Sequence, residues 1–137
     1  SELTLLEMAY AYTALAHGDR LNPMCIERII DREESTLLEP RGKKQRVINK
    51  KVLKNIRSML RAVIVNGTSK RAQALKKIVY GKTGTTNDYA DAWFIGFDDT
   101  TLAGVWVGRD GRLPIYEGAT GASVALPIWI EFMRDIP

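Results

Sequence analysis

The 137-residue sequence has 45% hydrophobic and 26% charged residues, the proportions expected of one soluble globular domain. One cysteine and one histidine exclude an internal disulfide and a zinc site with the usual ligand count, so we expect no metal and no cofactor. No apolar run approaches the roughly 18 residues of a membrane-spanning helix. The net charge of +4 gathers at 41–46 and 70–77 without interleaved aromatic residues, so we expect no nucleic-acid binding.

The first predicted element is a helix that starts at Leu5. Thr4 and Glu7 match the capping-box pattern, and Gly18 suits the left-handed residue that ends a helix. This helix begins almost at Ser1, with no initiator methionine and no signal-peptide pattern before it. We therefore expect the sequence to be a piece of a longer protein.

A peripheral hairpin is predicted next. Residues 24–30 alternate as a strand does, the polar residues 31–35 indicate a turn, and 36–39 would return as a short partner strand. Cys25 inside this hairpin is interpreted as a small buried hydrophobe.

A second helix is predicted after a basic loop at 40–45. Asn49 suits its N-cap, and Asn66-Gly67 would end it after Val65. Its apolar positions follow one buried stripe, made of Val52, Ile56, Met59, Leu60, Val63 and Ile64. The polar residues 68–77 are expected to form a loop or a short helical turn.

Three strands are predicted in close succession, at 78–85, 92–97 and 102–108. The short connection between the second and the third favours antiparallel pairing, and the apolar character of these two strands requires helices on both faces. Gly96 and Gly104 are expected where a helix or backbone approaches closely.

A glycine-rich loop at 109–121 leads to a last helix at 123–134. Pro127 is tolerated only in the first turn, so this helix either begins near Leu126 or is distorted there. The predicted fold class is α+β, a three-stranded antiparallel sheet packed with helices.

The first strand carries the candidate site. Lys82 supplies a positive charge, Thr83 and Thr85 supply hydroxyl donors, and Gly84 removes a side chain that would block the backbone. This combination suits recognition of a small carboxylate beside an exposed strand edge. Lys-Thr-Gly alone is weak, because a chain of this length would contain it by chance roughly three times in a hundred.

The surrounding segments make the pattern more specific. Their order closely resembles the end of the bifunctional (class A) penicillin-binding proteins, whose transpeptidase domain cross-links peptidoglycan. The resemblance covers nearly the whole chain and rests on residues 1–12, 59–63, 66–68, 81–88, 91–97, 104–108 and 125–129. It implies part of a beta-lactamase/transpeptidase-like fold.

The resemblance also implies a chemistry and roles for the motif. In this family a serine attacks the penultimate D-Ala carbonyl of a stem peptide, D-Ala leaves, and an amine from a neighbouring strand resolves the acyl-enzyme. Beta-lactams enter the same path and stall. Lys82, Thr83 and Thr85 would bind the substrate carboxylate, Gly84 would admit the substrate, and the backbone N–H of Thr85 would be one oxyanion donor.

Two of the three motifs of this enzyme class are absent from the sequence. None of Ser1, Ser35, Ser58, Ser69 and Ser123 begins Ser-x-x-Lys or Ser-x-Asn. We therefore expect 1–137 to be the C-terminal portion of one transpeptidase domain, inactive alone, with the nucleophile upstream of Ser1. Its partners would be the remainder of that domain and, in the parent, stem peptides and beta-lactams.

Three alternatives remain open at this point. The chain could belong to a related serine D,D-carboxypeptidase or beta-lactamase, or it could be a non-catalytic α+β binding module. A basic nucleic-acid binder is the third and would require steep salt dependence.

The resemblance further implies a parent anchored in the bacterial inner membrane, with this domain on the periplasmic side. If cover from the rest of the domain is missing, the isolated chain could form a homo-oligomer or swap strands.

Overall fold

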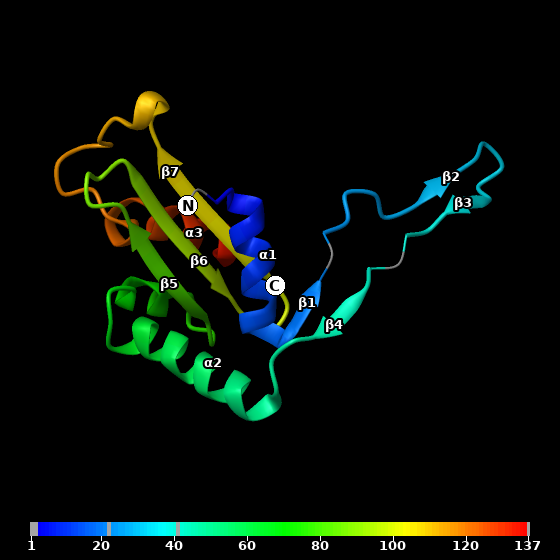
Figure 1. Cartoon of the computed structure of the whole chain (residues 1–137), viewed down its shortest axis with the longest axis horizontal. Helices are drawn as coiled ribbons and strands as arrows, with labels where there is room; N and C mark the ends of the chain where they lie inside the picture. Colours follow the sequence, from blue (N-terminus) through cyan, green and yellow to red (C-terminus); the bar gives the residue numbers. More distant parts are fainter. Residues whose placement is uncertain (1–2, 22, 41, 137) are drawn as a thin grey trace.

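A three-stranded antiparallel sheet organises the computed structural model (Figure 1). Its order is β5 (Tyr80–Thr85), β6 (Asp91–Phe97) and β7 (Leu102–Gly108), so β6 is central. All three predicted strands are confirmed, although β5 starts at Tyr80 rather than 78 and β6 at Asp91 rather than 92. The structure describes residues 3–21, 23–40 and 42–136. Ser1 and Glu2, with which the resemblance begins, and Arg41 of the basic stretch lie outside this description.

Helices cover the two faces of the sheet. In Figure 1, α1 (Leu5–His17) crosses one face over β6 and β7, and α3 (Leu126–Arg134) lies behind the sheet. The predicted capping box of α1 is present, and Gly18 ends the helix with φ 80°. Helices on both faces explain why β6 is apolar along nearly its whole length.

The two glycines singled out in the strands lie where helices approach, as predicted. A Cβ added to Gly104 would meet Leu5 of α1 at 2.9 Å, and one added to Gly96 would meet Trp129 of α3 at 2.7 Å. Each glycine therefore removes the side chain from a point where a helix contacts the sheet.

The core lies between the sheet and α3. Its central contact is the edge-on packing of Phe94 against Trp129, whose ring centroids are 4.9 Å apart. The buried members of this core are Ile64, Ala72, Val79, Phe94, Ala125, Leu126, Trp129, Ile130 and Met133. Burial of this apolar surface is the main stabilising term of the fold.

The second helix, α2 (Lys50–Val65), runs beside β5 and has Asn49 as its N-cap, as predicted. Its predicted buried stripe is only partly correct. Ile64 is fully buried, whereas Val52 is 44% exposed and Met59 63% exposed. The following residues form a short 3-10 helix, η1 (Lys70–Leu75), which confirms the helical alternative for 68–77.

The described residues between Asp19 and Arg46 form an arm that extends away from the body (Figure 1). Its base pairs β1 (Asp19–Leu21) with β4 (Lys44–Arg46), and its tip pairs β2 (Ile29–Ile30) with β3 (Thr36–Leu38). The tip confirms the predicted hairpin and its turn, in which the Asp31 carboxylate accepts the N–H groups of Glu33 and Ser35.

Three expectations for this arm were wrong. The strand predicted at 24–30 is limited to its last two residues, and part of the predicted basic loop at 40–45 is strand β4. Cys25 is exposed rather than buried. The cause is shared, since strands β2, β3 and β4 are exposed along their whole length, so alternation there does not report burial.

The last helix begins at Leu126, with Pro127 in its first turn, as one of the two alternatives predicted. A turn of π-helix, η3 (Gly121–Ala125), precedes it. The predicted helical pattern from 123 thus begins inside η3, whose wider hydrogen bonding differs from that of an α-helix, and the α-helix itself begins at Leu126.

Candidate functional site

Strand β5 carries the motif along one edge of the sheet. It pairs antiparallel with β6, and its other edge has no partner strand among the described residues. Gly84 lies opposite Trp93 in this register. An unpaired edge presents backbone N–H and C=O groups that an extended peptide can use.

The register places the motif side chains on two faces. Thr83 and Thr85 lie opposite Phe94 and Ala92, and therefore both lie on the face that packs on α3. Lys82 lies opposite Ile95 and therefore on the other face, towards α1. The cation and the two hydroxyls therefore flank the strand from opposite sides.

Lys82 is exposed and reaches over the strand rather than away from it. Its Nζ donates a 2.8 Å hydrogen bond to the carbonyl oxygen of Thr83. The ammonium is thereby held beside the motif backbone.

Both threonine hydroxyls have partners outside the strand. Thr83 Oγ1 lies 3.0 Å from Thr68 Oγ1, and Thr85 Oγ1 accepts a 3.0 Å hydrogen bond from the backbone N–H of Gly121. Sequence reasoning did not identify these two partners. Their residue types carry no signal by themselves, because threonine and glycine are common in loops.

The Thr85 backbone N–H faces the open edge. One residue later, the N–H of Thr86 donates to the Asp91 carbonyl oxygen at 3.1 Å, on the β6 side. Because N–H groups alternate in direction along a strand, the N–H groups of Thr85 and Thr83 point away from β6.

The loop after the motif is held by its own side chains. Thr86 Oγ1 accepts the N–H of Asp91, and Asp88 accepts that of Ala90. Hydrogen bonds from Thr86 and from the Ala90 backbone lower the pKa of the Asp88 carboxyl. These contacts fix the shape of the loop.

Two grooves border β5. At the C-terminal end of β5, a groove of about 1140 Å³ is lined by residues that include Leu5, Thr85, Trp93, Trp106 and Arg109. The first strand residue, Tyr80, borders the other groove.

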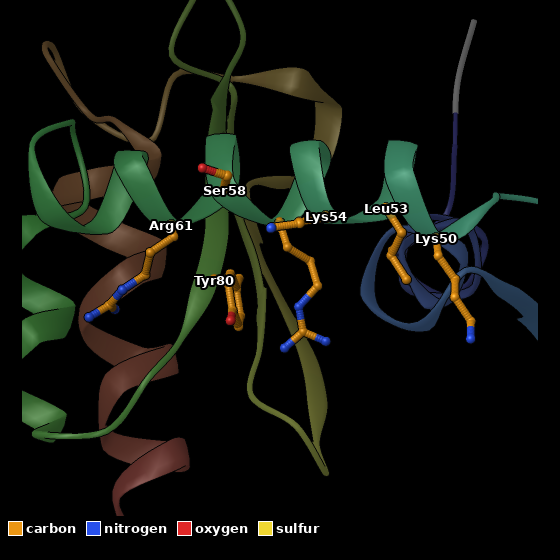
Figure 2. A pocket seen from close by; sticks show the side chains of 7 residues that line it. Lys50, Leu53, Lys54, Ser58, Arg61 and Tyr80 are labelled. Atoms are coloured by element: carbon orange, nitrogen blue, oxygen red, sulfur yellow. The ribbon is translucent and has the colours of Figure 1, made fainter.

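That second groove, of about 440 Å³, lies along α2 (Figure 2). Figure 2 shows Lys50, Leu53 and Arg61 extending from α2 on the side where the Tyr80 ring lies. Arg61 donates to the carbonyl oxygen of Val79 at 3.1 Å, so part of this basic lining has a structural role.

Comparison with known proteins places this geometry in a family. Residues 1–129 match the model of the penicillin binding protein transpeptidase domain. The chain belongs to the penicillin-binding protein transpeptidase family. It is 41% identical over 136 residues to penicillin-binding protein 1A of Aquifex aeolicus and 34% identical over 128 residues to penicillin-binding protein 4 of Bacillus subtilis. These alignments cover 98% and 93% of this chain but 19% and 20% of the relatives.

Solved structures of penicillin-binding proteins share the fold. Penicillin-binding protein 1A from Haemophilus influenzae superposes with a TM-score of 0.91 at 29% identity, over 98% of this chain and 27% of that one. Penicillin-binding protein A from M. tuberculosis, solved as an imipenem acyl-enzyme complex, gives 0.70 at 20% identity, over 98% and 32%. The α+β fold class and the predicted family are thus confirmed.

Among the residues that the structure describes, no helix has both the length and the apolar character that crossing a membrane requires. The chain spans about a fifth of the length of the curated relatives it matches.

Proposed function

We propose that this chain supplies the substrate-recognition strand of a serine D,D-transpeptidase that cross-links peptidoglycan stem peptides and is a target of beta-lactams. The observation that carries the proposal is the unpaired edge of β5, flanked by Lys82 on one face and by the Thr83 and Thr85 hydroxyls on the other. The membership of the transpeptidase family supports it.

The terminal carboxylate of the stem peptide would lie at this strand. Carboxylates accept hydrogen bonds only, so a site for them needs donors and positive charge. Lys82 supplies the charge, Thr83 and Thr85 supply O–H donors, and Gly84 leaves the backbone accessible. A peptide laid along the open edge would add backbone hydrogen bonds.

The backbone N–H of Thr85 would stabilise the reacting carbonyl. It faces the open edge, where the tetrahedral oxyanion would form after serine attack. Losing one such donor typically costs about 3 to 4 kcal/mol of transition-state stabilisation. The second donor in this scheme is the nucleophile's own N–H.

The nucleophile is proposed to come from the remainder of the transpeptidase domain, of which 1–137 would be the C-terminal portion. No serine of this sequence begins Ser-x-x-Lys. Ser69 is fully buried, and Ser123 is engaged in a capping box with Thr120. The parent would be anchored in the inner membrane with this domain on its periplasmic side.

Apolar surface on the helices fits a larger domain. Leu6 of α1 and Met59 of α2 are 62% and 63% exposed. Isolated exposed apolar residues are ordinary, but Met59 lies on the stripe of α2 that was predicted to be buried, and its exposure favours contact with further protein.

A labelled penicillin tests the proposal by intact-mass measurement. The 137-residue chain should form no covalent adduct, whereas the complete protein that contains it should gain one. An adduct on the chain alone would refute the assignment of the nucleophile to another segment, and no adduct on the complete protein would refute the transpeptidase proposal.

A related D,D-carboxypeptidase or beta-lactamase is the second candidate function, because these enzymes share the Lys-Thr-Gly strand. Product analysis with the complete protein separates the candidates. Cross-linked dimers from stem peptides support the transpeptidase, whereas released D-Ala without cross-links or rapid penicillin hydrolysis supports the related enzymes.

A further inference from the structure

Two groups outside the Lys-Thr-Gly strand contact its hydroxyls. Thr68, between α2 and η1, lies 3.0 Å oxygen to oxygen from Thr83. Gly121, at the start of η3, donates its backbone N–H to Thr85 Oγ1 at 3.0 Å. Thr83 and Thr85 therefore each have a fixed partner on the side that faces away from Lys82.

These partners determine where the hydroxyl protons can point. Thr85 Oγ1 accepts from Gly121, so its single proton remains available for donation. Between Thr83 and Thr68 either oxygen can be the donor. A carboxylate has no proton to give, so a carboxylate bound at Thr83 would require Thr83 to donate to it and Thr68 to donate to Thr83.

We propose that the Thr68 hydroxyl and the Gly121 N–H are positioning groups that hold the Thr83 and Thr85 hydroxyls as donors towards the substrate carboxylate. The assignment rests on the proposed function. Neither group touches the substrate in this scheme. Each acts through a threonine, and a hydroxyl that accepts one hydrogen bond is a better donor for the next.

The packing at Gly121 explains why a glycine stands there. A Cβ at this position would meet the carbonyl oxygens of Trp93 and Gly84, the latter at 2.6 Å. Both are backbone atoms of the sheet and cannot move aside cheaply. The absence of a side chain lets the Gly121 backbone approach β5 and reach Thr85.

Both sequence neighbours of Thr68 are anchored to α2 by backbone hydrogen bonds. Gly67 donates its N–H to the carbonyl oxygens of Ala62 and Val63, and Ser69 donates its N–H to that of Val63 at 3.2 Å. Ser69 is fully buried. A threonine between two anchored residues has little freedom, which suits a positioning role.

The test measures the second-order rate of acylation of the complete protein by a labelled penicillin and by its methyl ester, which lacks the carboxylate charge. With Thr68→Val, acylation by the free acid should be about fivefold slower, while acylation by the ester should be unchanged. Thr68→Ser keeps the hydroxyl and should restore the rate with the acid. Thr68→Ala is measured in parallel, so the comparison survives if the valine variant does not fold.

Ser69→Ala is the matched control. Its hydroxyl is buried without a hydrogen-bond partner in the described part of the chain, so its removal should leave both rates unchanged. Gly121→Ala should weaken acylation by the acid more than by the ester.

The outcomes separate the two proposals. A wild-type protein that is not acylated would overturn the proposed function and this assignment with it. A wild-type protein that is acylated, with Thr68→Val equal to wild type or equally slowed on acid and ester, would overturn the positioning role alone.

Discussion

The guanidinium carbon of Arg57 lies 4.4 Å from the centroid of the Tyr80 ring, at the start of the motif strand. The same guanidinium donates to the Ala16 carbonyl oxygen at the end of α1 and pairs with Asp99 in the turn after β6. The Tyr80 ring in turn stacks on Phe97, with centroids 5.1 Å apart. One side chain thus joins α1, α2, β5 and the β6–β7 turn.

Replacing Arg57 should therefore destabilise the chain. Arg57→Met keeps much of the apolar stem but removes the cation and its hydrogen bonds, so we expect a loss of about 2 kcal/mol in the free energy of unfolding. Urea unfolding measures this. Lys54→Met, on the exposed part of the same helix, is the control and should change stability by less than about 0.5 kcal/mol. Equal losses of stability for both variants would contradict the role of Arg57 in joining these elements.

The two strand glycines should respond differently to alanine. A Cβ at Gly96 would meet Trp129 at 2.7 Å and the Tyr80 carbonyl oxygen at 2.8 Å, whereas one at Gly104 would meet only the end of the Leu5 side chain closer than 3.4 Å. Backbone and a packed ring cannot yield as a leucine methyl can. Gly96→Ala should cost about 2 to 3 kcal/mol and Gly104→Ala less than about 1 kcal/mol, measured by urea unfolding. A larger loss for Gly104→Ala would contradict this packing.

Asp98 lies at the turn between β6 and β7 and is almost buried. Burial alone would raise its pKa, but hydrogen bonds from the backbone of Thr100 and Thr101 and from Lys77 outweigh it and lower the pKa to about 2, from 3.8. Lys77 Nζ lies 3.0 Å from Asp98 Oδ2. The ionised Asp98 carboxylate is thus favoured in the folded state and stabilises it relative to the unfolded state.

This shift has a defined pH window. A folded-state pKa below the unfolded value stabilises the fold fully above about pH 5, and the contribution disappears as pH falls through about 2. Asp98→Asn should therefore lose about 2 kcal/mol at pH 7, with the difference from wild type shrinking below pH 4. Urea unfolding at pH 7, 5, 4 and 3 measures it, and Glu39→Gln, in the exposed arm, should show no such trend. A difference that grows on acidification would contradict the assignment.

Features that depend on residues close together in the sequence were predicted correctly. The capping box of Thr4 and Glu7, the Asn49 cap and the Pro127 position all rest on contacts within one turn of helix, and the structure has them. The glycines at 96 and 104 were predictable because an apolar strand needs helical cover on both sides.

Contacts between distant segments were not predictable in this way. Thr68 and Gly121 lie 15 and 36 residues from the threonines they contact, and no periodic pattern links them. The predictions for the arm were wrong for a different reason. Its sequence alternates as a buried strand does, but its outer strands, β2 and β3, are exposed and cover no core. Cys25 and Met59 have the residue types of a core and yet are exposed.

The open edge of β5 leads to the last prediction, that the isolated chain associates. An unpaired strand beside exposed apolar helical residues can pair with a second copy. Light scattering should give a mass that rises above that of one chain with concentration. Leu37→Glu, which changes the exposed tip of the arm but not β5, should leave this association unchanged if the strand edge is responsible. A concentration-independent monomer would contradict pairing through β5, and a monomeric Leu37→Glu variant would assign the association to the arm.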